Sequence, residues 1–145
     1  KKPNSVTAVT QQLQAENNPK VDDEANFILT YDNATALIQA SWNWPIGRKD
    51  MEIYGLTGAI YADNRHDLRI RIAEGYDGYK EKQLKLEERD PPYDDPFAYL
   101  AAVIRDDIYP PAFDLSSMEN NMIGMEILDA AIRSAESGKS IKLKP

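Results

Sequence analysis

The part of the sequence best equipped for chemistry is residues 42–49, which read WNWPIGRK. The indole rings of Trp42 and Trp44 offer flat apolar surfaces on which a sugar or a similar ligand can lie. Arg48 can hold a carboxylate or hydroxyl groups through its planar set of donors. The alternative is structural, with one tryptophan buried, the other at a rim, and the remainder forming a solvated hairpin. The sequence therefore offers Trp42, Trp44 and Arg48 as a candidate substrate-binding site.

Few other residues could carry out chemistry. His66 is the only histidine, and it lies between Arg65 and Asp67 in a predicted turn, where we expect a solvated side chain rather than a catalytic one. One histidine and no cysteine provide too few ligands for a zinc or iron site. No metal site is therefore expected.

Acidic pairs and one glycine-containing turn complete the candidates. We expect the acidic pairs to lie in loops and at helix ends rather than to form a carboxylate dyad or a Mg²⁺ site; they are Asp22-Asp23, Asp94-Asp95 and Asp106-Asp107. The GLTG of residues 55–58 lacks the Lys-Ser/Thr of a phosphate loop and the spacing of a dinucleotide fingerprint. No catalytic or cofactor-binding residue is therefore expected in this chain.

The composition predicts one globular domain without a nucleic-acid or membrane partner. The chain has 145 residues, 42% of them hydrophobic, which is enough to bury a core. Its net charge of -7 repels phosphate backbones and disfavours polybasic attachment to a membrane. No apolar run approaches the roughly 18 residues that a membrane-spanning helix needs.

Cysteine content and targeting signals bear on the cellular location. The absence of cysteine excludes disulfides and a cysteine nucleophile, and it suits a reducing compartment, which favours the cytoplasm. No signal peptide is visible. The sequence does not begin with Met, so a targeting segment could have preceded Lys1.

Alternating apolar residues in 25–61 predict the sheet around which the chain is organised. Two runs of this stretch each place their apolar side chains on one face of a strand: Ala25, Phe27, Leu29 and Tyr31, then Ala34, Ala36, Ile38, Ala40 and Trp42. Between the runs, Asp32-Asn33 offers two residues that tolerate the positive φ expected of a tight hairpin. Two more strands begin at Met51 and Ala59. The pattern is typical of an antiparallel sheet with one well-buried face.

Further elements are predicted on both sides of this stretch. Strands are expected at 5–15, at 68–72 and, at a charged edge, at 79–87. Helical spacing covers 97–108 and continues from Met118 to a stop at Gly138, with N-caps at Asp94 or Asp95 and at Ser116 or Ser117. A short strand at 141–143 could close the chain.

A run of strands followed by helices indicates an α+β fold. We predict an open, predominantly antiparallel sheet of about six strands, with two C-terminal helices packed on one face and residues 1–145 forming a single domain. One apolar stripe of the second helix is expected to lie in the core: Met118, Met122, Met125, Leu128 and Ile132.

The sequence resembles the Gfo/Idh/MocA oxidoreductases, which include glucose–fructose oxidoreductase and inositol 2-dehydrogenase. The resemblance covers nearly the whole chain and rests on an ordered set of short motifs. These are Val21-Asp22-Asp23 before a strand, IQASW within Leu37–Trp42, the IxGxxG of Ile53–Gly58, and ILDAAIRSA at 127–135 with Gly138-Lys139.

The resemblance is to the C-terminal half of these enzymes only. Family members have an N-terminal Rossmann domain for NAD or NADP, a Glu-Lys-Pro segment whose Lys is catalytic, and an Asp/His motif just before the C-terminal sheet. None of these is present, and Lys2-Pro3 is not the Glu-Lys-Pro motif, because no acidic residue precedes it. The resemblance implies that NAD or NADP is bound mainly by the missing domain and that this chain alone binds none.

The resemblance also implies two roles for the two faces of the sheet. One side would bear the helices and the substrate cleft, to which Trp42–Arg48 would contribute a wall. The other side commonly forms a dimer interface, and the polar but broad outer face here would suit a homodimer: Asn26, Ile28, Thr30, Leu37, Gln39 and Ser41.

Two functions follow from these observations. The first is the C-terminal domain of an NAD(P)-dependent oxidoreductase that acts on a sugar, a polyol or a derivative, with no turnover by this fragment alone. The alternative is a stand-alone, non-enzymatic dimerisation or carbohydrate-binding module. A Rossmann glycine motif and Glu-Lys-Pro upstream of Lys1 would decide for the enzyme, and a start codon close to Lys1 for the module.

Overall fold

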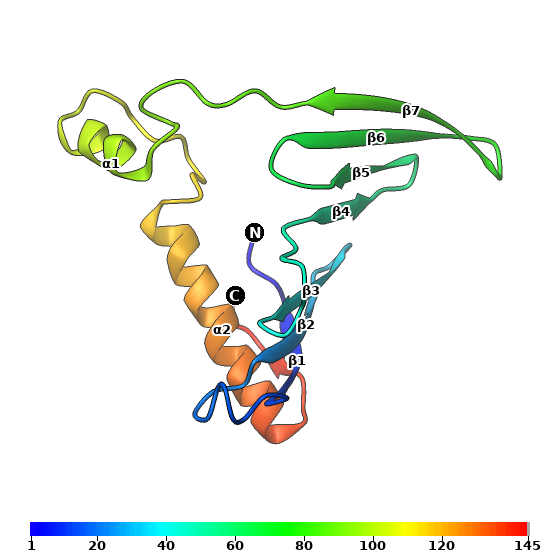
Figure 1. Cartoon of the computed structure of the whole chain (residues 1–145), viewed down its shortest axis with the longest axis vertical. Helices are drawn as coiled ribbons and strands as arrows, with labels where there is room; N and C mark the ends of the chain where they lie inside the picture. The colour runs from blue at the N-terminus through cyan, green and yellow to red at the C-terminus, as the bar shows by residue number, and fades with distance from the viewer. Residues whose placement is uncertain (145) are drawn as a thin grey trace. The chain divides into compact units, whose positions relative to one another are not determined.

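Figure 1 shows the computed structural model, which describes residues 1–144 as eight strands and two helices. The strands are β1 (Ser5–Gln11), β2 (Glu24–Thr30), β3 (Thr35–Ser41), β4 (Met51–Tyr54), β5 (Gly58–Ala62), β6 (Asp67–Glu74), β7 (Gly78–Lys85) and β8 (Ile141–Lys142). The helices are α1 (Pro96–Ile104) and α2 (Met118–Ser137). The chain forms two compact units: a first unit of Lys1–Pro45 with Pro110–Pro145, and a second unit of Ile46–Tyr109.

The first unit is built on an antiparallel sheet with the strand order β3-β2-β1-β8. Val6 pairs with Leu29 and Ala8 with Phe27, so the apolar residues that alternate along each strand share one face. Helix α2 packs on this face. The buried residues of this core are Val6, Ala8, Leu29, Ala130 and Ala131. The predicted buried face is therefore confirmed for β2, whereas Ile38 and Ala40 of β3 are exposed.

The hairpin between β2 and β3 forms at the predicted position, but its backbone differs from the prediction. The Tyr31 N–H donates to the Ala34 carbonyl at 2.9 Å. Neither Asp32 nor Asn33 has a positive φ, so that expectation was wrong. The Asp32 carboxylate instead accepts a hydrogen bond from Asn4 Nδ2 at 2.8 Å. A turn without a left-handed residue, tied to the N-terminal segment through the Asp32 carboxylate, therefore joins the two strands.

Helix α2 begins and ends at predicted residues. The Ser117 side chain caps its N-terminus by accepting a hydrogen bond from the Asn120 N–H at 3.2 Å. Gly138 ends the helix with a φ of 63°, a left-handed conformation that glycine adopts without steric cost. The helix approaches the sheet closely because small residues face it: Ala130, Ala131 and Ser134.

Ser134 ties α2 to the sheet through both functions of its hydroxyl group. The side chain is fully buried. Its Oγ accepts a hydrogen bond from the Ala8 N–H at 2.9 Å and donates one to the Lys139 carbonyl at 2.7 Å. Without Ser134, the Ala8 N–H and the Lys139 carbonyl would lose these hydrogen bonds, and a buried polar group without a partner is costly. The bonds fix the helix relative to β1.

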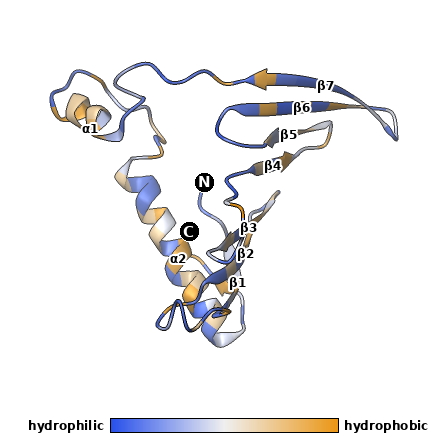
Figure 2. Cartoon of the chain, viewed as in Figure 1, coloured by the Kyte–Doolittle hydropathy of each residue, from blue (hydrophilic) through white to orange (hydrophobic). Residues whose placement is uncertain are grey.

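The apolar stripe expected in the core instead lies on the exposed side of α2. Figure 2 shows hydrophobic residues at several places along this helix. We call the stripe the methionine face; its side chains are 48–74% exposed, and its members are Met118, Met122, Met125, Leu128 and Ile132. The core is formed by the small residues around Ala130, which allow a closer approach to β1 than methionine does. The prediction that the methionine face packs in the core was wrong for the described residues.

The second unit contains an antiparallel meander with the order β4-β5-β6-β7. Its two faces differ in polarity. One row across the four strands is polar and aromatic: Glu52, Tyr61, Arg69 and Gln83. The neighbouring row on the opposite face is largely aliphatic: Ile53, Ile60, Ile70 and Lys82. The charged outer face predicted for residues 68–72 is therefore present.

Helix α1 is shorter than predicted. Asp95 is its N-cap, and one carboxylate oxygen accepts hydrogen bonds from the N–H groups of Phe97 and Ala98 at 2.9 and 2.7 Å. The helix ends at Ile104 rather than at 108, because Asp106 takes a left-handed φ of 60°. Among residues 1–144, α1 makes no extended contact with a strand.

The predicted α+β class with open antiparallel sheets is confirmed. The eight strands divide into two four-stranded sheets, whereas the prediction was a single sheet of about six strands. Helix α2 packs on β1 and β8 of the first sheet.

Candidate functional site

A buried aspartate organises the chain next to the candidate segment 42–49. Asp23 is 4% exposed. Its carboxylate accepts hydrogen bonds from the backbone N–H groups of Leu13 and Gln14 at 2.8 and 2.9 Å. The side-chain amides of Asn43 and Asn18 also donate to it, at 2.9 and 3.2 Å. Four donors thus converge on a single carboxylate.

These bonds shape both the backbone and the charge of the site. Strand β1 ends at Gln11 instead of at 15, because the next backbone N–H groups turn toward Asp23. The Leu13 N–H, with help from the other donors and against the effect of burial, holds the pKa of Asp23 well below its usual value of 3.8. Asp23 is therefore a structural anion rather than a proton donor.

The same aspartate fixes the start of the candidate segment. The Trp42 N–H donates to the Asp23 carbonyl at 2.9 Å, and Asn43 Nδ2 reaches the Asp23 carboxylate. The Asn43 N–H donates to Ser41 Oγ at 3.0 Å. Asn43 Oδ1 is buried and has no hydrogen-bond partner among residues 1–144. The polar residue between the two tryptophans thus anchors the segment.

Trp42 borders a small open hollow of about 170 Å³ at the end of β2 and β3. Its side chain is 72% exposed. Asp22 and Glu24 also line the hollow, together with Ala25 and Ala40. Ala25 pairs with Ala40 and Glu24 with Ser41, so the hollow lies at the end of the strand pair and is lined by residues of both sheet faces. An indole beside carboxylates can bind a molecule that is apolar on one side and rich in hydroxyl groups on its edge.

The other two predicted site residues lie elsewhere. Trp44 is half-buried and does not line this hollow. Arg48 belongs to the second unit and donates from Nε and Nη2 to the Asp50 carboxylate at 3.0 and 2.7 Å. Through the bonds from Arg48, the pKa of Asp50 is lowered. Trp42 and Arg48 line separate hollows, one in each unit.

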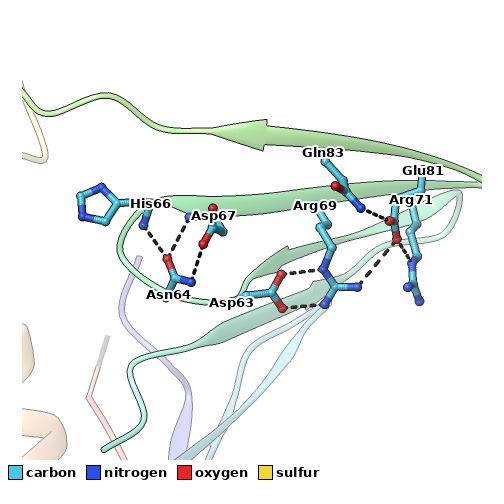
Figure 3. Close-up of polar contacts among 8 residues, drawn as sticks. All are labelled: Asp63, Asn64, His66, Asp67, Arg69, Arg71, Glu81 and Gln83. Carbon is cyan, nitrogen blue, oxygen red and sulfur yellow. Dashed lines mark hydrogen bonds and ion pairs between the residues drawn. The ribbon is translucent and has the colours of Figure 1, made fainter.

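The hollow beside Arg48 is open, with a volume of about 400 Å³. It is lined by charged residues of both signs, which include Lys49, Asp63 and Arg65. Figure 3 shows that Asp63 belongs to a network across strands β5–β7. Asp63 accepts two hydrogen bonds of 2.5 Å from Arg69, which lowers the pKa of Asp63.

The network continues to Glu81, which joins three residues. Arg71 Nε lies 2.7 Å and Arg69 Nη1 3.7 Å from the Glu81 carboxylate, and Gln83 Nε2 donates to it at 3.1 Å. The bonds from Gln83 and Arg71 lower the pKa of Glu81. These charges satisfy one another, so the network is a support for the sheet rather than a set of groups poised for proton transfer.

His66 is part of the turn predicted from the sequence. Its backbone N–H donates to Asn64 Oδ1 at 2.8 Å, and in Figure 3 its imidazole points away from the Asp63–Arg69 pair. Within residues 1–144 no three histidine, cysteine or acidic residues are grouped as metal ligands. No described helix is long and apolar enough to cross a membrane.

Sequence reasoning missed Asp23 and Asn43 as the organisers of this region. Asp22-Asp23 was interpreted as a loop pair, and Asn43 as part of a ligand-binding segment. The available signal was an acidic residue directly before a predicted strand, together with an amide directly after the partner strand. Such residues can exchange hydrogen bonds across a strand pair.

Comparison with protein families identifies a match to the first part of the chain. Residues 1–61 match the GFO/IDH/MocA C-terminal domain family. This range contains β1–β4, all of β5 except Ala62, Asp23 with its four hydrogen-bond donors, and the whole candidate segment. No curated protein matches the sequence.

Solved structures match along nearly the whole chain. Bacillus subtilis YvaA, assigned as an oxidoreductase, is similar with a TM-score of 0.72 and 16% identity over 99% of this chain and 46% of its own. A protein of Sinorhizobium meliloti 1021, assigned as a myo-inositol dehydrogenase, has a TM-score of 0.66 and 25% identity over 99% of this chain and 44% of its own. GenD2 of gentamicin A biosynthesis, solved with NAD, has a TM-score of 0.55 and 15% identity over 99% of this chain and 42% of its own. This chain therefore spans less than half the length of these structures.

Proposed function

We propose that this chain, whose residues 1–61 match the GFO/IDH/MocA C-terminal domain family, is the substrate-binding and oligomerisation domain of an NAD(P)-dependent oxidoreductase. The family match is the observation that carries the proposal. The predicted resemblance is confirmed by that match and by the fold shared over the whole chain with structures assigned as oxidoreductases. The cofactor and the substrate class belong to the proposal.

The hollow beside Trp42 supports a sugar, a polyol or a derivative as substrate. The indole offers an apolar surface for the carbon skeleton, and the carboxylates of Asp22 and Glu24 can accept hydrogen bonds from hydroxyl groups. One similar structure is assigned as a myo-inositol dehydrogenase, whose name denotes a polyol substrate. In this proposal Trp42 orients the substrate and the Asp23–Asn43 contact keeps Trp42 in position.

The residues of this hollow do not fit a dinucleotide. Its lining includes three consecutive acidic residues, which would repel a pyrophosphate: Asp22, Asp23 and Glu24. GenD2 was solved with NAD, but this chain corresponds to 42% of its length. We therefore assign NAD or NADP to the part of the enzyme outside this chain, and we route no chemical step through these residues.

The test is the product of the complete coding sequence that contains this chain. We expect it to reduce NAD or NADP with a panel of sugars and polyols. Trp42→Ala should raise the KM for the substrate about tenfold, with little change in the dissociation constant of the nucleotide, because only the stacking surface is lost. Steady-state kinetics and nucleotide titration give both quantities.

Tyr76→Ala is the matched control, since Tyr76 is a fully exposed aromatic residue in the turn between β6 and β7. An unchanged KM in Trp42→Ala would refute the role of the hollow. A coding sequence that starts close to Lys1, with no Rossmann glycine motif, would instead favour the stand-alone dimerisation or carbohydrate-binding module.

We also propose that the open face of the first sheet forms a homodimer. On the face opposite α2, three aliphatic side chains are 42–68% exposed among polar neighbours: Val9, Ile28 and Leu37. Light scattering of the chain should give the mass of a dimer at high concentration, and Leu37→Lys should give a monomer, because burying an unpaired ammonium group is costly. A wild-type chain that remains monomeric at every concentration would contradict this proposal.

A further inference from the structure

The methionine face of α2 is an extended apolar surface on the outside of the first unit. Its members recur at intervals of four, three, three and four residues, the spacing of an apolar seam between two helices. Successive helix residues turn by about 100°, so this face lies opposite the side that packs on β1. A folded protein rarely leaves so continuous an apolar stripe in water without an occupant.

The segment directly before α2 carries two more exposed apolar side chains. Phe113 and Leu115 are 85% and 86% exposed. Phe113 has a φ of 70°, which costs conformational energy in a bulky residue. Asn120 Nδ2 holds the turn by donating to the carbonyls of Phe113 and Asp114 at 2.9 and 2.7 Å. The turn is thus anchored to α2 while its apolar side chains point into solvent.

The start of the described chain lies beside the same helix. Lys2 Nζ is 2.5 Å from Glu126 Oε2. Glu126 is the residue after Met125, which is a member of the methionine face. Pro3 is buried, and Asn4 is fixed between two strands by hydrogen bonds to Thr30 and Leu143. Any residues that precede Lys1 therefore leave the first unit close to the middle of α2.

We propose that the methionine face, with Phe113 and Leu115, is the docking surface for the part of the protein that precedes Lys1. The inference rests on the proposed function, in which that part exists. The matched family is a C-terminal domain, and the similar structures are more than twice as long as the portion that this chain covers. The helical spacing of the surface fits an amphipathic helix of that preceding part as the occupant, packed side by side with α2.

Thiol labelling tests this proposal, because the chain contains no cysteine. Met122→Cys places a thiol within the methionine face, and Glu119→Cys places a matched thiol on an exposed position of the same helix outside that face. Each variant is made in the 145-residue chain and in the product of the complete coding sequence. Maleimide modification is followed by the mass of the peptide that carries the position, which separates it from any thiol in the preceding part.

We expect modification at position 122 to be slower by about tenfold or more in the longer protein, because reaction then requires the docked part to open. Modification at position 119 should proceed at similar rates in both. Equal rates at position 122 would overturn the proposal. Protection at position 122 that develops in the 145-residue chain as its concentration rises would also overturn it, in favour of a second copy as the occupant.

The two proposals fail in distinguishable ways. A longer protein that binds NAD or NADP but reacts at position 122 as fast as the short chain would refute the docking surface and leave the proposed function intact. Protection at position 122 in a longer protein that binds no nucleotide would support the docking surface and refute the dehydrogenase. A coding sequence that begins at Lys1 would overturn both.

Discussion

We expect Asp23→Asn to lower the Tm of the chain by about 10 °C, as measured by circular dichroism at pH 7. The two side chains have the same shape, but the new amide brings two donors to a site that already receives four. The N–H groups of Leu13 and Gln14 and the amide of Asn43 cannot all be satisfied by one remaining acceptor oxygen. Buried donors without acceptors are the costly outcome.

The same substitution predicts a pH dependence with a definite sign. The hydrogen bonds lower the pKa of Asp23 in the folded chain, so the folded state binds fewer protons at this group than the unfolded state does. Its stabilising effect is therefore complete above the unfolded pKa of 3.8 and is lost as the pH falls toward the folded value. The difference in Tm between wild type and Asp23→Asn should stay constant from about pH 6 to 8 and shrink below about pH 4.

Asp22→Asn is the control, because Asp22 carries the same side chain as its neighbour Asp23 but is exposed. We expect its Tm to stay close to that of the wild type. Similar losses of Tm in the two variants would show that general charge, and not the convergence of donors on Asp23, stabilises this region. A Tm difference for Asp23→Asn that grows below pH 4 would contradict the lowered pKa.

Gly58→Ala is expected to reduce the free energy of unfolding by about 3 kcal/mol, the upper end of the usual cost of overpacking. A Cβ at this position would overlap the backbone carbonyl oxygen of Arg71 and would lie 3.2 Å from Ile72 Cδ1. Gly58 pairs with Ile72 at the end of β5 and β6, so the strands would have to separate. A backbone oxygen in a sheet cannot move aside as a flexible side chain can.

Gly55→Ala provides the matched control in the same turn. Its Cβ would meet only the Gly58 carbonyl oxygen, at an ordinary distance of 3.6 Å, and its φ is not positive. We expect a change within about 0.5 kcal/mol. Urea unfolding followed by circular dichroism gives both values. Equal effects of the two substitutions would mean that lost glycine flexibility, and not the close approach to β6, determines the cost.

Much of the fold could be predicted because it depends on local patterns. Period-two alternation predicted the buried side of β2, and capping residues predicted where α2 begins and ends. The choice between the two apolar faces of α2 could not be made from spacing, because both have helical periodicity. That choice depends on how closely the helix approaches β1, which alanine and serine permit and methionine does not.

The candidate site could be predicted only as a segment. Two tryptophans and an arginine in eight residues indicated ligand binding, but the pairing of Arg48 with Asp50 depends on the local backbone. The role of Asp23 depends on donors that are 10 residues before it and 20 residues after it in the sequence. No periodicity reports such a convergence. The roles of Trp42, Trp44 and Arg48 in substrate binding remain predictions.

The discontinuous first unit has a consequence for the order in which the chain can fold during synthesis. Strand β1 lies between β2 and β8, and Val6 pairs with Ile141 near the opposite end of the chain. Helix α2, which closes the core over Val6, is also made late. The second-unit meander joins only strands that follow one another, so each of its pairings closes a short loop. The meander can therefore form on the ribosome, whereas the first core stays incomplete until the last strand has emerged.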